Sequence, residues 1–112
     1  MQVNDAINDR DNLYGKTVFL TGVLYLDRDS QYIVSNMSDL GKKGRGIQVL
    51  DHELEKLLLE KVSFWLGGAL YQDSIEVTGE IIKSENDDFR LAIGNLTRFK
   101  LYRDERSYDI LG

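Results

Sequence analysis

The 112-residue chain contains no cysteine and no proline, and it has a single histidine and a single tryptophan. Without cysteine it can form no disulfide, use no thiolate nucleophile and hold no cysteine-ligated zinc or iron-sulfur cluster. It also lacks an apolar run long enough to span a bilayer, and its first 15 residues lack the apolar segment of a secretory signal. We therefore expect a cytoplasmic protein with no redox role and no membrane partner.

Charge of one sign is in excess: 19 Asp and Glu stand against 14 Lys and Arg, which gives a formal net charge of −5. An acidic surface repels phosphate backbones, so nucleic acid would have to bind at a local basic patch. The length and the 42% apolar content suit one globular domain. We expect this domain to span residues 16–103, after an N-terminal appendage over 1–15 and before a polar tail over 104–112.

The hydrophobic pattern predicts a mainly β protein with one helix. Alternation and β-branched or aromatic residues predict strands over 16–26, 31–35, 47–50, 73–83 and 89–93, with residues 97–103 either continuing the last strand or forming a sixth. Apolar residues at helical spacing predict a helix from Asp51 to Val62. Asp51 is its expected N-cap, and its apolar stripe consists of Leu54, Leu57, Leu58 and Val62.

Two of the predicted strands carry Thr-Gly in their middle, as Thr21-Gly22 and Thr78-Gly79. A glycine inside a strand permits the sharp bend that closes a small barrel. The order of three strands, a helix and two strands, with these glycines in the first and fourth strands, resembles the OB (oligonucleotide/oligosaccharide-binding) fold, a five-stranded Greek-key barrel. The resemblance implies that the two Thr-Gly pairs lie side by side and that the helix plugs one end of the barrel. The alternative is an α+β fold in which a curved antiparallel sheet packs on one helix.

No residue pattern typical of an active site is present. His52 falls in the first turn of the predicted helix without a nucleophile motif, which favours an exposed first-turn residue over a general base. Asp27 with Asp29, and Asp87 with Asp88, lack the spacing of an EF-hand loop and read as solvated turn residues. We therefore predict no enzymatic activity, no catalytic residue, no metal and no cofactor.

Single-stranded DNA or RNA is one of two candidate ligands. The resemblance implies base stacking on aromatic residues of the second and third strands, where the chain offers one such ring. Cations gather in the glycine-rich loop Gly41–Gly46, which could surround a phosphate or be a plain solvated connection, and again after residue 97. The candidate nucleic-acid-binding residues are Tyr32, Lys42, Lys43, Arg45, Arg98, Lys100 and Tyr102.

Recognition of another protein agrees better with the composition. Acidic side chains on the helix and the fourth strand would steer a basic partner, and an aromatic residue after the helix would anchor it. The candidate protein-binding residues are Asp51, Glu53, Glu55, Glu60, Trp65, Glu76 and Glu80. Within this class, a small acidic chain suits an immunity protein or antitoxin that inhibits a basic nuclease toxin. The sequence leaves the partner's identity and the oligomeric state open.

Overall fold

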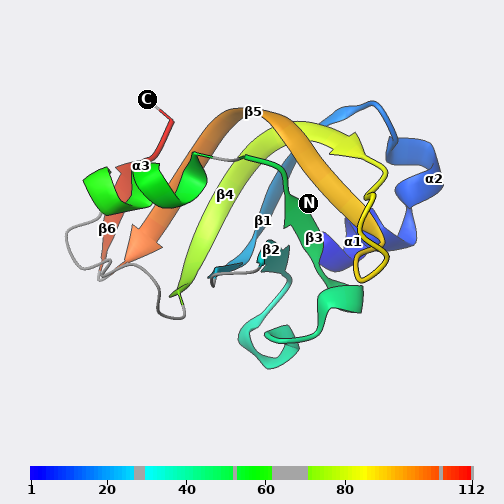
Figure 1. The fold of residues 1–112 in the computed structure, drawn as a ribbon, viewed down its shortest axis with the longest axis horizontal. Helices are drawn as coiled ribbons and strands as arrows, with labels where there is room; N and C mark the ends of the chain where they lie inside the picture. The colour runs from blue at the N-terminus through cyan, green and yellow to red at the C-terminus, as the bar shows by residue number, and fades with distance from the viewer. Residues whose placement is uncertain (27–29, 52, 62–70, 104, 112) are drawn as a thin grey trace.

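A β-barrel forms the centre of the molecule (Figure 1). The computed structural model describes residues 1–26, 30–51, 53–61, 71–103 and 105–111. The strands are β1 (Thr17–Leu26), β2 (Gln31–Val34), β3 (Ile47–Val49), β4 (Tyr71–Ile82), β5 (Leu91–Arg103) and β6 (Arg106–Asp109). The helices are α1 (Val3–Asn8), α2 (Arg10–Leu13) and α3 (Leu54–Lys61), and the 3-10 turns η1 (Met37–Asp39) and η2 (Lys43–Arg45) lie between β2 and β3.

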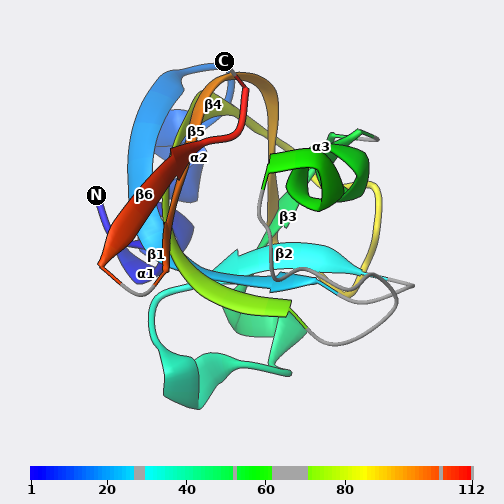
Figure 2. The same cartoon turned by 90° about the vertical axis from the view of Figure 1, so that its left-hand side faces the viewer.

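The barrel closes through a parallel pairing between β3 and β5, in which Ile47 lies opposite Leu91. Antiparallel pairs join β3 to β2, β2 to β1, β1 to β4 and β4 to β5. Five strands therefore form a ring, and β6 adds to β5 on the outside, as Figure 2 shows. The closed barrel confirms the mainly β prediction, is compatible with an OB-like fold and excludes the open curved sheet.

The two mid-strand glycines occupy different bends. Gly22 lies opposite Ile75 and Gly79 lies opposite Val18, so the glycines are offset along the β1–β4 pair and are not side by side as we expected. A Cβ atom on Gly22 would lie 2.5 Å from the carbonyl oxygen of Val34, whereas one on Gly79 would lie 2.8 Å from that of Gly94. Each glycine therefore admits a close backbone approach by a different neighbour, β2 in one case and β5 in the other.

β5 runs unbroken through the irregularity that the sequence suggested. Its register with β4 shifts between Thr78 and Glu80, and Asn95 adopts a positive φ of 47°. A bulge of this kind bends and twists a strand without ending its pairing. The first alternative, continuation of the strand past Gly94 and Asn95, is therefore correct, and the sixth strand comes later as β6.

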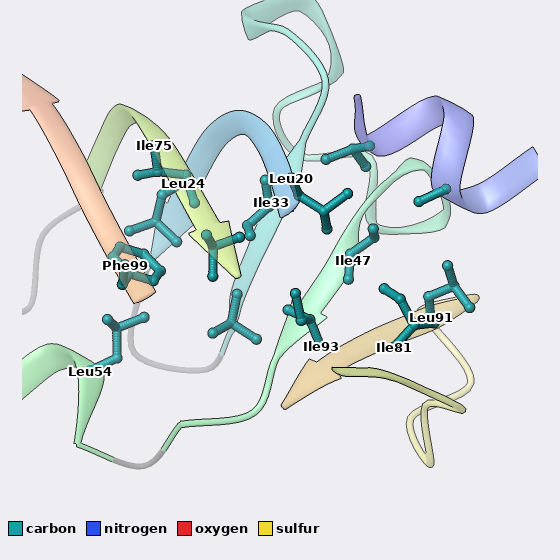
Figure 3. Close-up of a cluster of buried hydrophobic side chains, with 14 of the residues drawn as sticks. Leu20, Leu24, Ile33, Ile47, Leu54, Ile75, Ile81, Leu91, Ile93 and Phe99 are labelled. Carbon is teal, nitrogen blue, oxygen red and sulfur yellow. The ribbon is translucent and has the colours of Figure 1, made fainter. Parts of the chain in front are cut away.

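Inward-facing aliphatic side chains and Phe99 fill the barrel, and α3 covers one end of it (Figure 3). Leu54 and Leu58 of α3 are fully buried, with Leu54 pointing toward Phe99, and Leu57 is half-buried against the same core. The carboxylate of Asp51 accepts a 2.9 Å hydrogen bond from the amide of Glu53, but α3 begins only at Leu54, three residues after the predicted start at Asp51. Val62 lies outside the described residues, as do Asp27, Asp29 and His52.

Both ends of the chain contribute to the core. Val3, Ala6 and Ile7 of α1 are buried in the same cluster as the barrel side chains, although we expected residues 1–15 to be an appendage. The carbonyl of Met1 also accepts a hydrogen bond from the amide of Thr21. At the other end, the expected polar tail forms β6 and buries Ile110. These segments are too short and too polar for periodicity to reveal the few side chains that they bury.

Candidate protein-binding surface

The side of β2 that points away from the barrel interior is covered by the loop after β2 and by neighbouring aromatic rings. Tyr32 is only 1% exposed, because its ring stacks on Tyr25 with centroids 4.7 Å apart and packs against Phe89 at 5.3 Å. Leu40 packs on the same cluster, and the amide of Gly41 donates a 3.0 Å hydrogen bond to the Tyr32 hydroxyl. Tyr32 therefore presents no open ring to a base, which corrects its assignment as a stacking residue.

The basic loop between β2 and β3 carries its own counter-charges. The Lys43 ammonium lies 3.7 Å from the carboxylate of Asp88, and the Arg45 guanidinium lies 3.4 Å from that of Asp39. Asp39 is buried, whereas the Arg45 side chain is 64% exposed. Lys42 is exposed and forms neither of these pairs. Pairing with carboxylates lowers the potential that three free cations would offer to a phosphate backbone.

The candidate acidic residues divide into a helix group and a strand group. On the helix side, Asp51 is half-buried and accepts a hydrogen bond from the amide of Glu53, while Glu53 and Glu60 are exposed. The side chain of Glu55 and the whole of Trp65 lie outside the described residues. On β4, Glu76 and Glu80 are both half-buried, and Glu80 accepts a 3.3 Å hydrogen bond from the Asn95 side chain.

The outward-facing side of β1, β4, β5 and β6, called here the outer face, combines residues from both candidate sets. Glu76 of β4 lies opposite Lys100 of β5, which in turn lies opposite Asp109 of β6. In the neighbouring rows, exposed Arg98 and Tyr102 face uncharged residues of β4. Cross-strand neighbours of opposite charge attract each other. The outer face is therefore a mixed-charge surface, neither an acidic stripe nor a basic strip.

A pocket of about 290 Å³ opens on the outer face beside Tyr102. Its walls are mainly small or polar residues of β1 and β4, joined by Gln2 and Ser35. Among the described residues that line it, Glu76 is the only charged one. Tyr102 is 37% exposed, and the Lys100 ammonium lies 5.7 Å from its ring centroid, within the range of a cation-π contact.

Glu76 and Tyr102 interact directly at this pocket, where desolvation and this interaction shift the pKa of the tyrosine. Partial desolvation, a hydrogen bond to Glu76 and the negative charges of Glu76 and Asp109 raise the pKa of Tyr102 above its ordinary 10.0, and only Arg98 acts in the opposite direction. The phenol is therefore protonated at neutral pH and donates to the carboxylate. A carboxylate accepts several hydrogen bonds, so Glu76 keeps acceptor capacity for a further donor that enters the pocket.

No protein-family model matches the chain, and no curated protein is detectably similar to it. Within the described ranges, no three His, Cys, Asp or Glu side chains converge as the ligands of a metal ion would. None of the helices in the described part of the chain has the length and apolar composition needed to cross a lipid bilayer.

Two contributors to the outer face lie outside both sets of candidate residues. Phe19 is 45% exposed and alternates with fully buried Leu20, so its phase in β1 was the available indication that it faces outward. Gln2 reaches the pocket through a parallel bridge to Thr21. No local pattern indicates this second contact, because it depends on where α1 docks.

Proposed function

We propose that this protein is a non-enzymatic binding protein that recognises a basic protein through its outer face. The observation that carries the proposal is the pocket beside Tyr102, where Glu76 supplies the charge. A lysine or arginine of the partner would lay its aliphatic stem along Tyr102 and place its cationic end at Glu76. Exposed Phe19 on the same side of the sheet adds aromatic area of the kind that is enriched at the centres of protein interfaces.

The charge of the whole chain supports a basic partner, since a formal charge of −5 steers cationic surfaces toward it. Within this class we propose an inhibitor of a cationic nuclease, in the manner of an immunity protein or antitoxin, because a nuclease cleft carries positive charge to hold its phosphate substrate. We also propose that the barrel is a member of the OB superfamily. The pairing of β1 with β4 and the position of α3 between β3 and β4 support this assignment.

Single-stranded nucleic acid is the competing ligand, and the structure offers it less. Arg98, Lys100 and Tyr102 share the outer face, but acidic residues lie on both sides of Lys100. The remaining ring of that candidate set, Tyr32, is buried. Stacking supplies about 1–3 kcal/mol per base, so the two exposed rings of this face, Tyr102 and Phe19, leave little affinity once ordering costs are subtracted.

Affinity capture followed by titration tests the proposal. Extract of the source organism is passed over the immobilised wild-type protein, and the retained protein is purified and titrated against variants. We expect a basic partner whose Kd rises about tenfold or more with Glu76→Lys, because an attractive contact becomes repulsive. We expect Tyr102→Ala to raise the Kd about thirtyfold, as removal of an interface hot spot does. For the immunity assignment, the captured protein must also cleave nucleic acid and lose that activity in the complex.

Glu60→Lys is the matched control, because it makes the same charge change at an exposed position of α3. It should leave the Kd within about twofold, as expected for a surface charge outside the contact. If Glu76→Lys and Glu60→Lys raise the Kd equally, the partner responds only to the net charge of the protein, and the proposal that it binds at the pocket is rejected. Retention of nucleic acid without any basic protein, together with steeply salt-dependent binding of an oligonucleotide, would favour the competing ligand.

A further inference from the structure

A second cavity has the opposite electrostatic character. A cleft of about 410 Å³ lies between α1, the first residue of α2, the turn η2 and the residue that precedes β5. The residues that line it are Asn4, Ile7, Asn8, Arg10, Gly44, Arg45 and Arg90. Three guanidinium groups thus come from three separate segments, and no carboxylate is among the described lining residues. In a chain with a net charge of −5, this concentration of positive charge is an exception, even though the carboxylate of Asp39 offsets part of the charge of Arg45.

The three arginines keep donors available to a ligand. Arg10 gives one 3.0 Å hydrogen bond to the carbonyl of Ile7, and Arg45 contacts Asp39 through a single nitrogen at 3.4 Å. A guanidinium has five N–H donors, so both side chains retain unused ones. Arg90 is exposed directly before β5. Arginine is the side chain best shaped for bidentate contacts with phosphate oxygens.

We propose that this cleft binds a compact polyphosphate group, either pyrophosphate itself or the diphosphate of a nucleotide. The volume lies within the range of small-molecule sites. Amide side chains of Asn4 and Asn8 supply further donors, while Ile7 is the one apolar side chain among the lining residues that the structure describes. No aromatic ring is in that set to stack on a base, so recognition falls on the phosphates.

The cleft also gives a role to the glycine-rich loop Gly41–Gly46, which has no part in the proposed protein-binding surface. Gly44 and Arg45 of that loop line the cleft, and no residue of the loop is among those that line the pocket beside Tyr102. The two sites can therefore be tested independently, and failure of one leaves the other standing.

Isothermal titration of the full chain with pyrophosphate tests this site. Arg90→Gln is the informative variant, because Arg10 also bonds α1 and Arg45 also pairs with buried Asp39. We expect pyrophosphate to bind the wild type and Arg90→Gln to raise the Kd about tenfold or more, as loss of a charge-assisted contact does. Arg98→Gln, an identical change on the outer face, is the matched control and should leave the Kd unchanged. Circular dichroism verifies that both variants are folded.

Further titrations with ADP and with a single-stranded oligonucleotide identify the source of the phosphates. Equal affinity for ADP and pyrophosphate supports the site and assigns recognition to the phosphates, while tighter ADP binding supports it with the nucleotide as the natural source. No heat from millimolar pyrophosphate overturns the proposal. Equal weakening by both variants overturns it as well, and so does an oligonucleotide that binds more tightly than pyrophosphate and depends on Arg90.

Discussion

The hydroxyl of Tyr32 accepts a 3.0 Å hydrogen bond from the amide of Gly41, which holds the loop after β2 against the side of that strand that points away from the barrel interior. Tyr32→Phe leaves this amide without its partner and should lower the free energy of unfolding by about 1–3 kcal/mol. Tyr32→Ala also empties the space between Tyr25 and Phe89 and should cost about 3–5 kcal/mol. Urea denaturation measures both. Tyr14→Phe, at an exposed tyrosine, is the control, and a Tyr32→Phe protein as stable as the wild type would contradict the assigned bond.

The close approach of β2 to Gly22 predicts that replacing a glycine by alanine destabilises the protein at this position and not at an open one. A Cβ atom there would lie 2.5 Å from a backbone oxygen and 2.8 Å from Ile33, so the strands must separate. Gly22→Ala should therefore destabilise the protein by about 1–3 kcal/mol or more. Gly44→Ala places its methyl group in open space and should change stability by less than about 0.5 kcal/mol. Thermal denaturation that ranks the two variants in the reverse order would reject the described approach of β2 to β1.

Burial of α1 predicts that the N-terminal segment is required for stability. Val3 is fully buried, so Val3→Ala removes two methyl groups from the core and should cost about 2 kcal/mol. Met37→Ala, at an exposed position, should cost less than about 0.5 kcal/mol. Deletion of residues 1–8 should lower the thermal midpoint further than Val3→Ala does. A truncated chain with wild-type stability would restore the interpretation of this segment as an appendage.

The fully buried leucines of α3 predict that the helix stabilises the open end of the barrel. Leu58→Ala should lower the free energy of unfolding by about 2–5 kcal/mol, because the barrel strands cannot collapse into the space that it leaves. Leu50→Ala is the matched substitution at a leucine that is 44% exposed, and it should cost less than about 1 kcal/mol. Chemical denaturation distinguishes the two, and similar losses would contradict the packing of α3.

The contact between Glu76 and Tyr102 predicts an alkaline pH dependence. The pKa of Tyr102 is raised in the folded protein, so its stabilising contribution is fully present below pH 10.0 and is lost as the pH rises through the folded value. Glu76→Gln removes a negative charge and should bring the pKa of Tyr102 back toward 10.0. Carbon-13 NMR of the tyrosine rings measures the change. Glu80→Gln is the control, and an unchanged Tyr102 titration in Glu76→Gln would contradict the hydrogen bond.

Much of the barrel is predictable because the spacing of apolar residues along the sequence indicates its strands and its helix. The apolar phase of Leu54 and Leu58 places both on the buried side of α3, and the alternation after Asp73 gives the inward residues of β4. Tyr32 shows the limit of that reasoning. Its phase puts it outside the barrel correctly, but Leu40 and Gly41 of the loop between β2 and β3 close over it. Burial by a loop depends on where the loop folds, which alternation does not encode.

Local sequence patterns are sufficient to predict the five barrel strands, α3, their order and the side of each strand that faces the core, because these follow from interactions between residues only a few positions apart. Contacts between side chains that are distant in the sequence follow instead from the tertiary fold. Glu76 lies opposite Lys100 and beside Tyr102 because β4 and β5 pair in one register around a bulge. The arginine cleft likewise exists because α1 docks beside η2. Both arrangements depend on strand register and chain closure over long separations, which no short stretch of sequence specifies.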